Sequence, residues 1–494
     1  MRLWGACMAL LLAMLSLPAH ADWHRIETAE FALQADMEPA ELRLVGAQLV
    51  EHDRLLRQVL GVTGPGRGRR LEIIIHGNRA RLVAEAGMPE MASGFFHASP
   101  VENFALIPSS DDEDPDHDVL TILRHEYAHY FMMRHLGHWQ PAWYIEGFAS
   151  FFETAHRGPD GIMRYGAAPS VMPLFLEEMG GLPFTRLASI AYDRADGIDR
   201  PKLYAQGWLI TSHYYLGGPQ APGIAAYLDA ASKGRKADPA VFAGGPAQFD
   251  RDVNAWFEAG LPTPREIVIE PVDPATIAIR PLSAGEIAIV DLRFDIYRRM
   301  SQITDINEGF DAWSILTSRA KALAAAHPGD RPVGAYIAKL LLHADIGEAS
   351  SEEIAAAIDP AGTTSEDRIL QARLAARRAN EGPPAQFQRR IVAARSILEK
   401  ILQAEPDNVD ALFAMYDNIR EAEGASPKAI QHLARALAID PTNSEWRLRL
   451  LELYMRNGRT ADAIRLLEPV ANLPHGGGDA DMAAELIRML RSGR

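Results

Sequence analysis

The sequence predicts an α+β domain followed by an all-α helical region. Up to about residue 260, short apolar runs typical of strands alternate with stretches of helical periodicity. From about residue 303 the chain is rich in alanine and has helical periodicity alone, with similar residues recurring about every 34 positions. A length of 494 residues fits two or three domains of ordinary size.

The composition is that of an ordinary folded protein, with 48% hydrophobic and 23% charged residues. The formal net charge of -15 argues against nucleic acid as the main partner, because a polyanion would be repelled. The negative charge favours solubility.

The first 21 residues have the pattern of a signal peptide. Arg2 precedes an apolar run from Ala9 to Leu17, and Ala19-His20-Ala21 forms an Ala-x-Ala cleavage site. The run is shorter than the roughly 20 residues of a membrane span. The single cysteine, Cys7, lies before the cut. We therefore expect cleavage near Ala21 and a bacterial periplasmic or secreted protein with neither a stable membrane span nor disulfides.

Residues 22–260 are expected to form the α+β domain. Its predicted elements are a strand at 31–35, an amphipathic helix at 40–60, a buried strand at 71–75, and strands at 94–96 and 104–107. The acidic run at 111–114 is read as a solvated loop before a helix, with calcium binding as the less favoured alternative.

A metal site is predicted next, from the motif His125-Glu126-Tyr127-Ala128-His129. Residues four apart lie on one face of a helix, so both imidazoles can converge on one ion. Glu146 follows on a second helix that begins near Pro141, and two His with one Glu is a known ligand set of catalytic zinc. We expect one Zn²⁺ ion, held by His125, His129 and Glu146, with Glu126 as the general base.

These residues resemble the gluzincin metallopeptidases of the peptidase MA clan. The stretch WYIEGFASFFE, from Trp143 to Glu153, is similar to the third-ligand helix of the aminopeptidase-N-like branch, although the spacing from His129 to Glu146 is slightly shorter here. The resemblance implies a zinc peptidase whose sheet has an edge strand lining the cleft and pairing with the substrate backbone. The candidate for that strand is the segment from Asn103 to Ile107.

The same resemblance suggests a donor to the oxyanion. Tyr204-Ala205-Gln206-Gly207 resembles the Tyr-x-x-Gly element of the aminopeptidase-N-like enzymes, whose Tyr hydroxyl donates to the developing oxyanion. A core tyrosine on an amphipathic helix is the alternative for Tyr204. His213 is a second candidate donor, for which a structural role is favoured.

Four further residues are weaker candidates. Glu102 and Asn103 loosely resemble the Gly-x-Met-Glu-Asn element in which a Glu holds the substrate amine, whereas the default for Glu102 is a solvated loop carboxylate. Ser150 stands where thermolysin-like relatives have the Asp that supports a ligand His, and Glu153 on the same helical face could replace it.

The remaining chain is divided into a proline-rich linker at 261–302, containing a small β-hairpin, and a helical domain at 303–494. Its clearest repeats lie at 390–475, where Ala394, Ala429 and Ala463 each precede a leucine by four residues. This pattern resembles tetratricopeptide (TPR) repeats, with a generic helical bundle as the alternative. The resemblance implies a solenoid that binds a protein partner.

Two functions follow. The first is an exported zinc peptidase in which a metal-activated water hydrolyses peptide bonds and the TPR-like region recruits a protein substrate or partner. The alternative is a TPR scaffold whose gluzincin-like domain binds zinc without catalysis. Neither the substrate nor the choice between aminopeptidase and endopeptidase follows from the residues.

Overall fold

The computed structural model describes most of the chain. The described residues are 23–64, 66, 68–87, 94–98, 101–109, 118–136, 139–190, 199–300, 306–343, 349–441, 443–472 and 477–492. The expected signal peptide and the acidic run at 111–114 lie outside them. Among the described helices, none is both long enough and apolar enough to cross a membrane.

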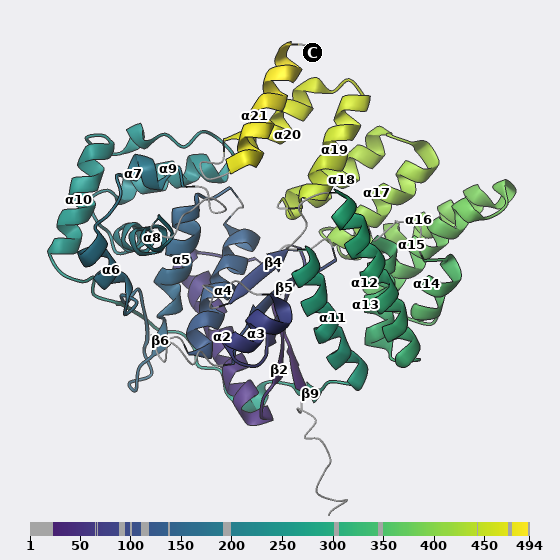
Figure 1. Ribbon diagram of the computed structural model, residues 1–494, viewed down its shortest axis with the longest axis horizontal. Coiled ribbons are helices and arrows are strands. Elements are labelled where there is room, and N and C mark those ends of the chain that lie inside the picture. The colour runs from purple at the N-terminus through teal and green to yellow at the C-terminus, as the bar shows by residue number, and fades with distance from the viewer. Residues whose placement is uncertain are drawn as a thin grey trace, which may run out of the picture.

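A six-stranded mixed sheet forms the centre of the N-terminal unit, with the strand order β4-β5-β3-β2-β1-β9 (Figure 1). The strands are β1 (Trp23–Glu27), β2 (Phe31–Asp36), β3 (Leu71–Ile75), β4 (Phe95–Ala98), β5 (Asn103–Ile107) and β9 (Ile279–Pro281). The central strands β2, β3 and β5 run parallel, and the outer pairs are antiparallel. All five residues of β3 are buried, as a parallel strand covered on both faces requires.

The prediction that residues 103–107 form the edge strand is wrong. β5 lies between β4 and β3, and β4 occupies the edge. Residues 95–98 pair antiparallel with residues 103–106, so β5 runs back along β4. Any backbone pairing with a peptide at this end of the sheet would therefore use β4.

Helices cover both faces of the sheet. The N-terminal unit contains α2 (Pro39–Leu60), α3 (Arg79–Ala86), α4 (Val119–His135), α5 (Ala142–Glu153), α6 (Met172–Met179), α7 (Phe184–Leu187), α8 (Asp199–Tyr215), α9 (Ala221–Ser232) and α10 (Pro246–Glu258). Along β3, Ile73 and Ile75 face the core shared with α2 and α4, whereas Ile74 faces α3 and α11 (Ala284–Met300). This alternation follows from the two-residue period of a strand.

Small additional elements complete the N-terminal unit. They are a three-stranded sheet of β6 (His156–Arg157), β7 (Met163–Tyr165) and β8 (Arg265–Ile267), and the 3₁₀ turns η2 (Pro239–Val241) and η3 (Pro274–Thr276).

The hairpin predicted within residues 261–302 is also wrong. β9 pairs with β1, and the second apolar stretch belongs to helix α11. The helix starts at a reciprocal pair in which the Glu286 amide donates to Ser283 Oγ and the Ser283 amide donates to the Glu286 carboxylate. This Ser-x-x-Glu pattern is a capping box. The side chains of α11 pack on the sheet on one face and on the C-terminal helices on another, so this helix joins the two units.

Ten helices described after α11 form the C-terminal unit, which in Figure 1 arcs from the right of the N-terminal unit up to the top, where α21 lies. They are α12 (Ile306–Ala326), α13 (Arg331–His343), α14 (Ser351–Ala357), α15 (Ser365–Glu381), α16 (Pro384–Ala404), α17 (Val409–Glu423), α18 (Pro427–Ile439), α19 (Ser444–Arg456), α20 (Thr460–Ala471) and α21 (Gly477–Ser492). Ala394, Ala429 and Ala463 are fully buried. At the end, α21 covers the apolar face of α20.

Candidate metal centre

Two adjacent helices, α4 and α5, present the predicted metal ligands. Helix α4 begins at Asp118, whose side chain accepts a hydrogen bond from the Thr121 amide, a typical N-cap. Helix α5 begins directly after Pro141, which has extended backbone angles and occupies the N-cap position. The connection between the two helices is short, and α5 packs against α4, as the sequence predicts.

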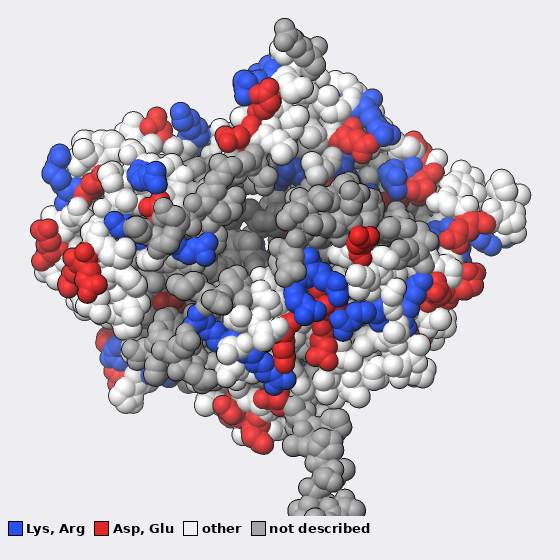
Figure 2. Space-filling model, in the orientation of Figure 1, with Lys and Arg blue, Asp and Glu red and all other residues white. Residues whose placement is uncertain are grey.

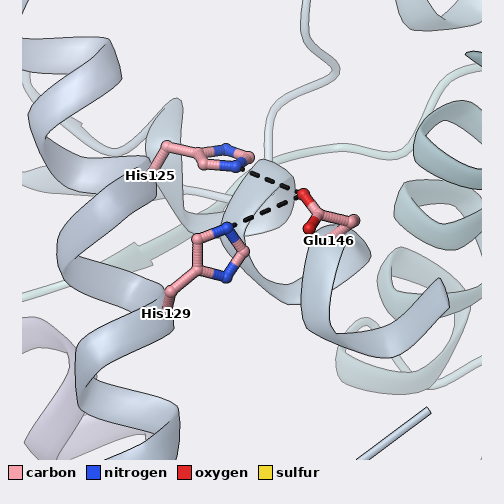
Figure 3. Close-up of side chains that lie close together, drawn as sticks. All are labelled: His125, His129 and Glu146. Atoms are coloured by element: carbon pink, nitrogen blue, oxygen red, sulfur yellow. Dashed lines mark ion pairs between the residues drawn. The ribbon is translucent and has the colours of Figure 1, made fainter. Parts of the chain in front are cut away.

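His125, His129 and Glu146 come together as predicted (Figure 3). Their ligand atoms lie within 4.8 Å of one another. Glu146 Oε2 is 3.5 Å from His125 Nε2 and 3.6 Å from His129 Nε2. Two atoms that each lie about 2.1 Å from a tetrahedral zinc ion are about 3.4 Å apart, so the two distances from Glu146 are close to those of a zinc site, and two His with one Glu are donors that zinc accepts.

Glu153 contacts the first candidate ligand, His125. Its carboxylate lies 2.6 Å from His125 Nδ1, which leaves Nε2 facing Glu146. A carboxylate that accepts the Nδ1 proton fixes the tautomer whose Nε2 lone pair can bind a metal. Ser150, the other candidate for this role, is fully buried, and its hydroxyl has no hydrogen-bond partner among the described residues.

The histidines differ in their protonation. Burial lowers the pKa of His129 to about 4, so this imidazole is neutral at pH 7. Burial also opposes protonation of His125, but its hydrogen bonds to Glu146 and Glu153 outweigh burial and hold its pKa well above the usual value. A metal ion would replace that proton, because an imidazole must be neutral to bind it.

Glu126 is buried beside the candidate ligands. Burial raises the pKa of Glu126 to about 7, with repulsion from Glu146 and Glu153 adding to burial and His125 opposing it. A Cβ atom at Gly94 would lie 3.3 Å from Glu126 Oε1 and 2.9 Å from Ile122. Sequence reasoning does not identify Gly94 as a site residue, although a glycine beside a strand can signal close approach of a neighbour.

Tyr204 is also brought to the site. Its ring is nearly parallel to that of His125, with the centroids 6.5 Å apart. The close crossing of α5 and α8 sets this position, because Gly147 and Gly207 meet there without side chains. A Cβ atom at Gly207 would lie 2.3 Å from the Trp143 carbonyl oxygen, and one at Gly147 would lie 2.2 Å from the Gly207 oxygen.

The structure does not bring the remaining candidates into this cluster. The Glu102 carboxylate accepts hydrogen bonds from Arg293 and from the Tyr336 hydroxyl of the C-terminal unit. Asn103 is the first residue of β5. His213 accepts a hydrogen bond from the Gln220 amide in the turn after α8, and burial lowers its pKa to about 4. The solvated-loop reading of Glu102 is therefore wrong, since it is buried against the second unit.

The comparisons with known proteins concern the C-terminal unit. Residues 421–484 match the family model described as tetratricopeptide repeat. No curated protein and no solved structure matches the chain. Since TPR repeats typically bind other proteins or peptides, the matched segment suggests a protein-protein interaction. Residues 421–484, which run from the end of α17 into α21, are therefore similar to tetratricopeptide repeats.

Proposed function

We propose that this protein is an exported zinc-dependent peptidase. The observation that carries the proposal is the convergence of His125, His129 and Glu146 on one point, with Glu126 and Tyr204 beside them. The donor types and their spacing suit a zinc ion, and the order of the residues resembles that of the gluzincins.

Zinc held by these three side chains would supply Lewis acidity that polarises a carbonyl group and acidifies a coordinated water. In the proposed reaction Glu126 takes a proton from the attacking water and passes it to the leaving amine. The Tyr204 hydroxyl donates a hydrogen bond to the oxygen on which negative charge develops. Glu153 keeps the His125 ring oriented throughout.

The proposal gives no amine-binding role to Glu102, because its carboxylate is engaged by Arg293 and Tyr336. We therefore expect cleavage that does not require a free N-terminus. A peptide library tested with free and with blocked N-termini measures this directly. Cleavage restricted to the free peptides would overturn this part of the proposal.

The alternative is a scaffold that binds zinc without catalysis, and the TPR match at residues 421–484 favours it to the extent that such repeats bind proteins. The separating experiment uses the chain from residue 22 onward, loaded with zinc, and the variant Glu126→Gln. The peptidase proposal predicts that the variant keeps zinc and loses cleavage of the library by at least about 100-fold, in line with the loss of a general base. Glu399→Gln, at an exposed position of α16, is the matched control. Absence of cleavage by the zinc-loaded wild type favours the scaffold.

A further inference from the structure

The C-terminal unit contacts the N-terminal unit at several of its helices. Tyr336 on α13, Asp410 on α17, and Trp446 and Arg447 on α19 all contact N-terminal residues, and we call these four residues the inner face. Between the two units lies a cavity of about 460 Å³, lined by acidic and basic side chains of both. In Figure 2, blue and red side chains are interspersed near the junction of the two halves.

Arg69, just before β3, makes the most extensive of these contacts. Its Nη2 donates to Asp410 Oδ1 at 2.7 Å, and its Nε lies 3.2 Å from the same oxygen. Asp440 Oδ2 lies 3.7 Å from Nη1, and the guanidinium carbon is 5.5 Å from the centre of the Trp446 ring. Two carboxylates and the face of an indole ring together form a binding site for a guanidinium group. The Arg69 side chain is only 9% exposed.

The backbone of Arg69 is fastened to the metal-site helix on its other side. Its carbonyl oxygen accepts hydrogen bonds from the Tyr130 hydroxyl and from Arg134 Nη1, each at 3.1 Å. Tyr130 and Arg134 belong to α4 and follow His129 by one and five residues. One residue thus connects the inner face to the helix that carries both candidate histidine ligands.

Two further contacts hold the units together. The guanidinium of Arg447 lies over the Trp139 ring, just after α4, at 4.8 Å. At the far end of the solenoid, the Asn472 side chain donates to the Gly234 carbonyl oxygen at 2.9 Å. The C-terminal unit therefore contacts the N-terminal unit at several points along its length. Arg69 is the contact residue whose backbone is hydrogen-bonded to α4.

We propose that Asp410, Asp440 and Trp446 of the C-terminal unit form a docking site whose partner is Arg69 of this same chain, and that the docking of Arg69 there holds α4 in place. The guanidinium site formed by Asp410, Asp440 and Trp446 is occupied by the chain's own Arg69. An outside protein must bind the solenoid elsewhere or displace Arg69. This inference rests on inter-unit contacts and does not depend on peptidase activity.

Amide hydrogen exchange of the full mature chain tests the proposal. Arg69→Ala is expected to speed exchange in residues 119–135 by about ten-fold or more, because α4 loses its link to the solenoid. Asp410→Asn, which leaves the N-terminal unit unaltered, should speed exchange in the same residues. The double variant should exchange no faster than Arg69→Ala alone, since both changes break one interaction.

Arg456→Ala is the control, because this arginine of α19 forms an exposed ion pair with Glu452. It should leave exchange in α4 unchanged. Unchanged exchange in α4 for Asp410→Asn would overturn the proposal, even if Arg69→Ala fails to fold. Additive effects of the two substitutions would also overturn it. Loss of peptidase activity with unchanged exchange speaks against the docking and leaves the proposed function standing.

Discussion

Replacing Gly207 with alanine should damage the site without touching a ligand. The new Cβ would lie 2.3 Å from the Trp143 carbonyl oxygen, whereas ordinary contacts begin at 3.4 Å, so α5 and α8 must separate by about 1 Å. The obstacle is backbone, which no side-chain rotation can relieve. Overpacking of this kind costs about 1 to 3 kcal/mol of folding free energy.

The shift also moves Tyr204, one turn earlier on α8, relative to His125. A misplacement of about 1 Å at a catalytic group can lower the rate about 100-fold. If α8 moves away from α5, the three candidate ligands, which lie on α4 and α5, keep their positions, so zinc binding should persist. We therefore expect Gly207→Ala to lower kcat about 100-fold with zinc content unchanged.

The assay compares kcat, KM and zinc content for the wild type, Gly207→Ala, Tyr204→Phe and the double variant. If Gly207 acts by positioning Tyr204, the double variant should be no slower than the slower single variant. Gly64→Ala is the control, since a Cβ there meets nothing within 4 Å. Unchanged kcat in a folded Gly207→Ala protein, or effects that multiply in the double variant, would refute the reasoning.

Two other predictions concern buried carboxylates. Glu153→Gln should weaken zinc binding about 10- to 100-fold, because the Glu153 carboxylate orients the His125 ring. Competition with a chelator measures the zinc affinity, and an affinity equal to that of the wild type would show that the contact is dispensable. Glu72 is buried with Arg25, and although burial alone would raise its pKa, the charge and hydrogen bonds of Arg25 lower the pKa to about 2. Because the pKa of Glu72 is lower in the folded than in the unfolded chain, its ion pair with Arg25 stabilises the fold above about pH 4.5. That stabilisation disappears as the pH falls toward 2. Urea unfolding of Glu72→Gln between pH 5 and pH 3 should show a weaker pH dependence than that of the wild type, by on the order of 1 kcal/mol or more; identical slopes would contradict this.

Local patterns in the sequence predict much of the secondary structure. The buried run at residues 71–75 is strand β3, and the amphipathic stretch at 40–60 is helix α2, because apolar spacing and burial agree there. The buried alanines of the C-terminal unit were identifiable since a 34-residue repeat recurs in sequence. The gluzincin type of the N-terminal unit stays a prediction.

Long-range pairing was not predictable in the same way. The position of β5 inside the sheet depends on β4 folding outside it, and no local pattern of either strand specifies this order. The stretch from Glu286 to Val290 alternates apolar and small residues like a strand, yet the capping box with Ser283 starts a helix.

In the candidate site too, the sequence identifies some residues by local spacing but does not reveal contacts between distant residues. The cluster of His125, His129 and Glu146 was identifiable because the four-residue spacing places both histidines on one face of a helix and because all three residue types bind metals. The engagement of Glu102 by Tyr336 joins residues far apart in sequence, so the loose motif around Glu102 could not reveal it. The contact of Arg69 with Asp410 is of the same long-range kind.

The zinc content of the purified, metal-loaded chain tests the central claim most directly. We predict about one zinc per chain for the wild type, since three protein ligands bind a single ion. His129→Ala and Glu146→Gln should each lose most of it, whereas Glu126→Gln should retain it. A wild type that takes up no zinc, or ligand variants that hold as much as the wild type, would contradict the account.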